Sequence, residues 1–159
     1  MIEVPRPDFV ERAETHLEEI TDGELLLLKG HLLLEEALFS AVRAKCPNPA
    51  YFEKADLGFY KLLLIARALY PAPTDDEKYM KTFEMFWDGA EALNNLRNKF
   101  AHSLEPEKIA PLLKRLWLPS TDNAKPLEDE KVVMALGITV SILIGYAWGL
   151  ATKNESKAA

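Results

Sequence analysis

The chain has 159 residues, of which 48% are hydrophobic and 28% are charged, and its formal net charge is −6. This length and composition fit a single globular domain with a substantial core. The acidic balance argues against a protein that coats duplex DNA, because such binding depends on lysine and arginine neutralising many phosphates. The single cysteine, Cys46, excludes an intrachain disulfide and suits the cytoplasm, which is the expected location.

Helical signals follow one another along the chain, and no segment shows the period-two alternation of a strand. Asp22 precedes a leucine-rich stretch as an N-cap, and Thr74 opens a capping box with Glu77. The expected helices cover residues 7–20, 23–45, a short piece from 49, 57–70, 75–102, 106–118 and 127–152. The sequence therefore predicts an all-α, up-and-down bundle of about six helices. Its expected parts are an N-terminal helix within 1–21, a single bundle domain over 22–152 and a polar tail over 153–159.

The last expected helix carries no charge over 132–152, which is long enough to span a membrane. Small residues recur along it every four positions and would let another helix approach closely: Gly137, Ser141, Gly145 and Gly149. We expect this helix to be buried in the bundle or in a dimer interface, and we therefore expect no membrane contact. A C-terminal membrane anchor is the alternative.

The segment whose residue types best suit a catalytic or binding site is 93–102, with the sequence LNNLRNKFAH. On a helix that turns ~100° per residue, its apolar residues fall on one stripe. Asn94, Asn98 and His102 fall on another stripe, which a monomer would leave in solvent, and Arg97 flanks it. One helix would thus hold a guanidinium suited to phosphate, an amide that can orient it and an imidazole that can transfer protons near neutral pH.

Arg97-Asn98, three further residues and His102, placed late in a helical chain, resemble the signature of the HEPN superfamily of helical nucleotide-associated domains. The resemblance covers about residues 22–118. It is strongest to bacterial helical proteins with an Arg-Asn-x-x-Ala-His motif, and the layout is distantly similar to the mannitol repressor family. In ribonuclease members of the superfamily, two protomers bring their motifs together across a cleft. The resemblance therefore implies a HEPN-like bundle and a homodimer.

Two functions are compatible with this motif. The first is metal-independent cleavage of RNA, or binding of RNA or a nucleotide. In it Arg97 binds the phosphate, Asn98 orients the contact and His102 acts as the acid/base catalyst. The second is a non-catalytic regulatory module that binds a protein partner, as the mannitol repressor resemblance suggests.

The sequence discriminates between the two through a few positions. The intact motif favours cleavage. The acidic balance favours the binding module, as does Leu104, because many ribonuclease members carry a tyrosine at that place. In a purely structural role, the polar residues of the motif would bond backbone carbonyls at a helix end, and Arg97 would pair with Glu91 or Glu105.

Other candidate residues are few. His31 and Glu35 lie one helical turn apart and are expected to form a buried or half-buried pair, or else to line the cleft beside Arg97. No spacing of His, Cys, Asp or Glu is typical of a metal site, and no phosphate-binding glycine loop is present, so neither a metal nor a cofactor is expected. The three tryptophans are expected in the core or in an interface.

Overall fold

The computed structural model describes residues 6–72, 75–102 and 106–152, with side chains over 11–72, 75–101 and 107–152. Its helices are α1 (Arg6–Leu17), α2 (Gly23–Lys45), α3 (Pro49–Phe52), α4 (Phe59–Leu69), α5 (Glu77–His102), α6 (Pro106–Arg115) and α7 (Glu130–Thr152), with a 3₁₀ turn η1 (Pro126–Glu128). These ranges contain no strand, so the predicted all-α helical bundle is confirmed. The expected tail, 153–159, lies outside the described residues.

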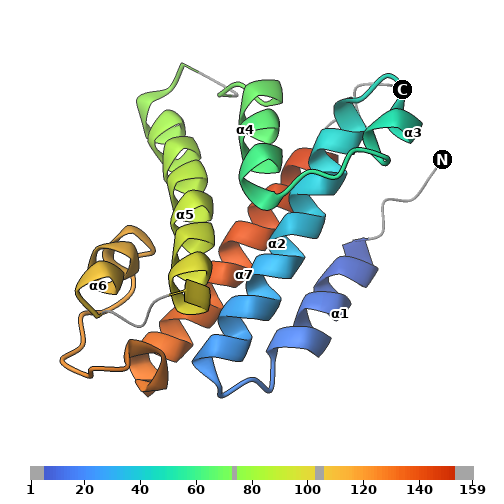
Figure 1. Cartoon of the computed structure of the whole chain (residues 1–159). Helices are drawn as coiled ribbons and strands as arrows, with labels where there is room; N and C mark the ends of the chain where they lie inside the picture. Colours follow the sequence, from blue (N-terminus) through green and yellow to red (C-terminus); the bar gives the residue numbers. More distant parts are fainter. Residues whose placement is uncertain (1–5, 73–74, 103–105, 153–159) are drawn as a thin grey trace.

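Helices α2 and α7 run side by side through the middle of the molecule, with α1 on one side and α4 and α5 on the other (Figure 1). Two glycines on one face of α2 permit the close approach of α7 and of η1. A methyl group at Gly30 would lie 2.5 Å from Val140 Cγ1 of α7, and one at Gly23 would lie 2.3 Å from the carbonyl oxygen of Leu127 in η1. The packing of α7 and η1 on α2 therefore depends on the absence of side chains at these two positions.

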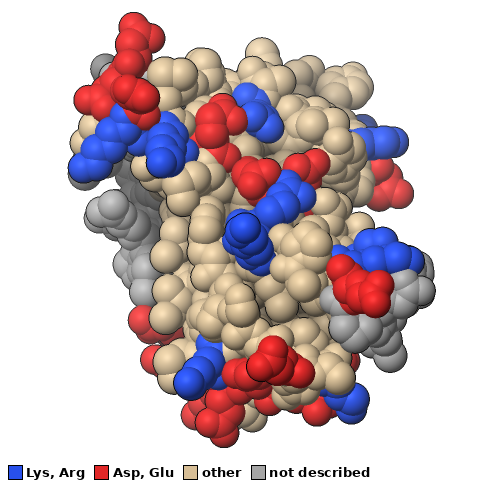
Figure 2. Space-filling view, turned by 90° about the vertical axis from the view of Figure 1, so that its left-hand side faces the viewer, with Lys and Arg blue, Asp and Glu red and all other residues tan. Residues whose placement is uncertain are grey.

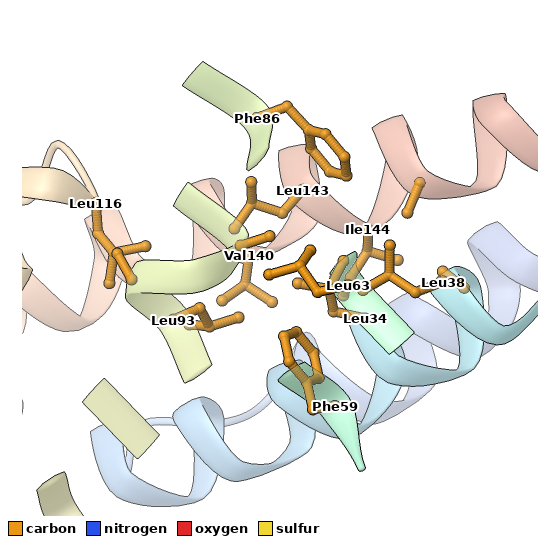
Figure 3. Packing of buried hydrophobic residues seen from close by; sticks show 14 of the residues in the cluster. Leu34, Leu38, Phe59, Leu63, Phe86, Leu93, Leu116, Val140, Leu143 and Ile144 are labelled. Atoms are coloured by element: carbon orange, nitrogen blue, oxygen red, sulfur yellow. The ribbon is translucent and has the colours of Figure 1, made fainter. Parts of the chain in front are cut away.

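The core fills the space between the central pair and the flanking helices α4 and α5 (Figure 3). Fully buried aliphatic side chains dominate it, each contributing roughly 1.5–3 kcal/mol relative to exposure. They come from four helices: Leu34 and Leu38 of α2, Leu62 of α4, Leu93 and Leu96 of α5, and Val140, Leu143 and Ile144 of α7. This packing fixes the side of α5 that carries the Arg97 motif against α2 and α4.

Several helix boundaries differ by a few residues from those expected, and capping explains where α7 begins. The last helix begins at Glu130 rather than 127, because the carboxylate of Asp129 accepts hydrogen bonds from the backbone N–H groups of Lys131 at 2.9 Å and Val132 at 3.3 Å. Similarly, α5 begins at Glu77 after Asp76. The expected cap, Thr74, lies outside the described residues.

Helix α6 ends at Arg115 instead of 118 because the backbone turns left-handed at Trp117, with φ of 58°. The N–H of Leu118 then bonds the carbonyl of Leu113 at 2.9 Å, which is the pattern of a Schellman cap. Glycine usually occupies this position. Here the tryptophan ring lies over Gly89 of α5 and fastens the end of α6 to that helix.

Candidate functional site

The C-terminal half of α5 carries the Arg97 motif. Leu93 and Leu96 are completely buried, as the predicted apolar stripe requires. Asn94 departs from expectation: only 7% of its surface is exposed, although the sequence placed it on a solvated stripe. Asn98 is half-buried. His102 is the last residue of α5, and its side chain lies outside the described residues, as does Leu104.

A histidine on the neighbouring helix explains the burial of Asn94. The Nε2 atom of His31 lies 3.0 Å from Asn94 Oδ1, and the His31 ring stacks on Phe59 at the start of α4 with centroids 4.3 Å apart. His31 is only 5% exposed. Burial lowers its pKa below the usual 6.5, the bond to Asn94 opposes this, and the nearby charge of Arg97 lowers it further.

The oxygen atom of the Asn94 amide sets the direction of the hydrogen bond to His31. An amide oxygen only accepts, so Nε2 carries the proton and donates it to Asn94 Oδ1. The NH₂ group of Asn94, at the other end of the amide, is then a hydrogen-bond donor beside Arg97. The buried Nδ1 of His31 has no partner among the described residues.

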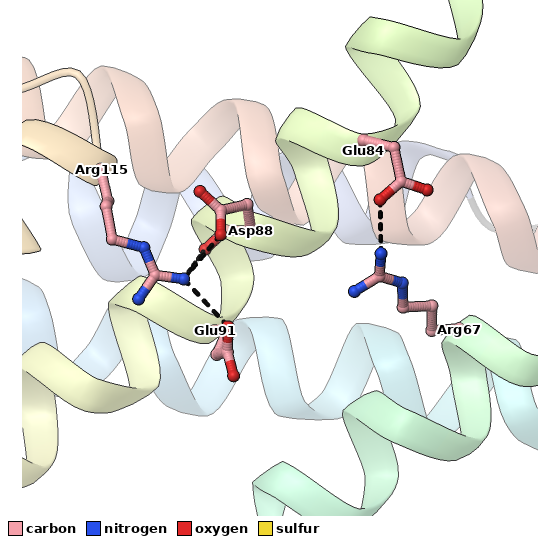
Figure 4. Close-up of polar contacts among 5 residues, drawn as sticks. All are labelled: Arg67, Glu84, Asp88, Glu91 and Arg115. Carbon is pink, nitrogen blue, oxygen red and sulfur yellow. Dashed lines mark hydrogen bonds and ion pairs between the residues drawn. The ribbon is translucent and has the colours of Figure 1, made fainter.

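Arg97 is half-buried and held by its neighbour on α5. Its Nη1 donates a hydrogen bond of 3.2 Å to Asn98 Oδ1. Glu91, one carboxylate partner suggested for Arg97, instead accepts from Arg115 Nη2 at 2.9 Å, and Arg115 also bonds Asp88 (Figure 4). The other suggested partner, Glu105, lies outside the described residues.

These groups line one cleft of about 510 Å³ between α2, α4 and α5. The side chains with polar groups that line it are those of His31, Glu35, Tyr60, Lys61, Asn94, Arg97 and Asn98. Burial raises the pKa of the Glu35 carboxyl, while the positive charge of Arg97 opposes that rise. Two cations, two amides and a single carboxylate thus face the cleft, an arrangement that can bind an oxyanion such as phosphate.

His31 and Glu35 therefore take the second of the two roles that the sequence allowed, since both line the cleft beside Arg97. Sequence reasoning missed the contribution of α4, where Phe59 supports His31 and Lys61 adds a cation. Neither residue carries a signal of its own. Only the folding of α4 onto α2 brings them to the site.

The small-residue ridge of α7 does not face the bundle. The inner side of α7 is buried against α2 through residues such as Val140 and Ile144, whereas Ser141 and Gly145 are exposed. A methyl group at Gly145 would meet nothing within 4 Å, so the packing within the chain does not require a glycine at this position. One side of α7 is thus packed in the core, and the other side is exposed to solvent.

By length and composition α7 could also cross a membrane, with a mean hydropathy of 1.9 over its most apolar window. In the structure, 39% of that window is buried. On the face that carries α4, α5 and α6, lysines and arginines are interspersed with acidic residues and no large patch of one sign is visible (Figure 2). This distribution agrees with the sequence-based argument against non-specific binding to duplex DNA.

Among the described residues, no group of three or more His, Cys, Asp or Glu side chains could hold a metal ion. Comparisons with family models, curated proteins and solved structures gave no match.

Proposed function

We propose that this chain is a HEPN-like protein that binds RNA in the cleft between α2, α4 and α5 and cleaves it without a metal ion. The observation that supports this most is the convergence of Arg97, Asn94 and Lys61 on one cleft. Arg97 is aligned by Asn98, and the amide of Asn94 is aligned by His31. The cleft consequently presents mainly hydrogen-bond donors, the polarity that a phosphodiester requires.

In the proposed reaction, Arg97 holds the non-bridging oxygens of the scissile phosphate and stabilises the added negative charge of the transition state. The 2′-hydroxyl oxygen attacks phosphorus and the bond to the 5′-oxygen breaks, which leaves a 2′,3′-cyclic phosphate and a 5′-hydroxyl. His102 accepts the proton of the 2′-hydroxyl, and in a dimer the partner's His102 donates one to the leaving oxygen. His102 lies at the C-terminus of α5, where the helix dipole favours its protonated form.

The same proposal includes a homodimer that brings two clefts together. Leu25, Leu28 and Leu32 form an exposed apolar row on α2, at 42%, 43% and 50% exposure. Leu25 and Leu28 share a hollow of about 420 Å³ with Arg97, so this row borders the cleft. A second copy seated on the row would place its own Arg97 nearby.

The α7 ridge is unsuited to this dimer. Leu32 follows Gly30, the residue that touches α7, by two positions or about 200° of helical turn. The exposed leucines and the outer face of α7 thus lie on opposite sides of the molecule. The ridge of α7 and the cleft therefore belong to different surfaces.

The test is an assay of wild type and variants on unstructured RNA in EDTA, with end-group analysis and melting curves for each protein. Wild type should cleave and leave 2′,3′-cyclic phosphate ends. His102→Ala should abolish cleavage with the fold intact, and Arg97→Lys should lose most of it, because an ammonium cannot form the two parallel bonds of a guanidinium. Matched controls are His16→Ala and Arg43→Lys, since both residues are exposed on other surfaces. Absence of cleavage by pure wild type on several RNAs would reject the proposal.

The exposed outer face of α7 favours a second candidate function, a regulatory module that binds a protein. Met134, Ile138 and Ile142 are all more than half exposed. The proposed RNA cleavage takes place in the cleft and does not involve this face of α7. A binding module of the mannitol repressor type would use it and need no catalysis at His102.

A further inference from the structure

The outer face of α7 carries three large apolar side chains, each one helical turn from the next. Met134 is 71% exposed, Ile138 59% and Ile142 58%. Single exposed apolar residues are ordinary, but a continuous row on one helix face is typical of an interaction surface. The small residues Gly137 and Ser141 lie beside this row.

Helix α1 turns this face into a groove of about 620 Å³. Its floor is the apolar row with Gly137 and Ser141, and its wall on α1 includes Glu14 and Glu18. Glu11, Glu14 and Glu18 are all exposed and follow the i, i+3, i+7 spacing of one helix stripe. The guanidinium of Arg12 on α1 bonds Glu36 of α2 at 2.7 Å instead. The groove thus combines an apolar floor with an acidic wall.

We propose that this groove binds an amphipathic helix of another protein, with the apolar side of that helix on α7 and its basic residues on the glutamates of α1. The inference rests on the second candidate function, names its partner class and is independent of RNA cleavage. A helix fits because Gly137 and Ser141 admit the close approach of a backbone. From Met134 to Ile142 the floor extends eight residues, or about 12 Å, which matches two turns of a docked helix.

The charges disfavour the other occupants. In a second copy, the apolar row lies within the uncharged stretch 132–152 of α7, and the stripe of α1 beside it is acidic. The one lysine of α7, Lys131, precedes the row and can pair with at most one of Glu14 and Glu18. A bilayer surface carries anionic headgroups, which the same glutamates would repel. A helix with lysines or arginines along the edge of its apolar face satisfies both parts of the groove.

The test measures fluorescence anisotropy of two labelled helical peptides of about 18 residues, one of leucine and lysine and one of leucine and glutamate, with the same apolar face. The full-length protein should bind the lysine peptide and not the glutamate peptide. The double variant Glu14→Lys/Glu18→Lys should weaken binding of the lysine peptide at least tenfold and gain binding of the glutamate peptide. Ile138→Ser/Ile142→Ser should weaken binding at least tenfold without changing the charge.

The matched control is Glu77→Lys/Glu107→Lys, which changes the net charge by the same amount at exposed residues of other helices. It should leave the affinity for the lysine peptide within about twofold of wild type. Equal loss of affinity in this control would show non-specific electrostatic attraction and overturn the proposal.

Two further measurements test other occupants of the groove. If sedimentation shows a dimer that Ile138→Ser dissociates, the groove binds a second copy of the chain. If the protein cosediments with phospholipid vesicles and Ile138→Ser abolishes this, the groove binds a membrane. Either result contradicts the partner helix, and RNA cleavage, assayed separately, should be unchanged in all groove variants.

Discussion

The pair of His31 and Asn94 is the most informative contact at the scale of single residues. Burial lowers the pKa of the His31 imidazole, and its Nε2–H group donates to Asn94 Oδ1 and so fixes the orientation of that amide. Protonation at Nδ1 would leave this bond in place but would put an unpaired charge beside Arg97. The stability of the fold thus depends on the protonation state of His31.

This dependence predicts acid sensitivity. The unfolded chain binds a proton at His31 near pH 6.5, while the folded chain resists it because its pKa is lowered. The stability from neutral His31 is therefore complete above 6.5 and is lost as pH falls below that value. Glu35 has the opposite effect on stability. Because burial raises the pKa of its carboxyl, the stability that protonated Glu35 contributes is present below pH 4.5 and is lost as the pH rises.

The variant His31→Gln keeps a donor for Asn94 and removes the titration. Between about pH 7.5 and about pH 5.5 its melting temperature should fall less than that of wild type. His16→Gln, an exposed histidine on α1, is the matched control and should follow wild type. A steeper fall in His31→Gln than in wild type would mean that the imidazole is not neutral in the fold.

At the scale of helices, the glycines of α2 and α7 have different roles. Gly30 lies where α2 packs against Val140 of α7 and leaves no room for a side chain, whereas Gly145 is exposed to solvent. A matched pair of alanine substitutions separates these roles.

Gly30→Ala should destabilise the protein by about 1–3 kcal/mol, because its methyl group must displace Val140 in a packed core. Gly145→Ala should stabilise it by about 0.5–1 kcal/mol, because alanine is the better helix former at an exposed position. Urea denaturation of both variants gives the two values. Equal effects of the two substitutions would contradict the packing of α7 on α2.

The sequence predicted the helices well because leucine periodicity and caps are local properties. It predicted the stripe of Leu93 and Leu96 for the same reason. It did not predict the burial of Asn94, whose partner His31 lies 63 residues earlier, because a helical period says nothing about which helix faces which stripe. The prediction for the small residues of α7 failed for a similar reason, since large apolar side chains lie on both the buried and the exposed side of α7, and its sequence alone does not show which side meets α2.

At the scale of the molecule, two apolar surfaces lie on opposite sides of the central helix pair. The row of Leu25, Leu28 and Leu32 borders the cleft and is proposed for the homodimer. Sedimentation equilibrium at micromolar concentration should give twice 17.9 kDa, and Leu28→Glu/Leu32→Glu should give the monomer and lose RNA cleavage. A monomeric wild type, or a dimer indifferent to these substitutions, would contradict the composite cleft.

The proposed function requires that RNA phosphate binds in the cleft beside Arg97. The most direct measurement is a ¹H–¹⁵N NMR titration with a short RNA whose 2′-hydroxyls are methylated, so that it binds without being cleaved. The side-chain NH₂ signals of Asn94 and Asn98 should shift with added RNA, while the indole N–H of Trp87, buried in the core, stays in place. In Arg97→Gln these shifts should disappear at the same RNA concentrations. Amide signals of Asn94 and Asn98 that stay unmoved at saturating RNA would contradict the account.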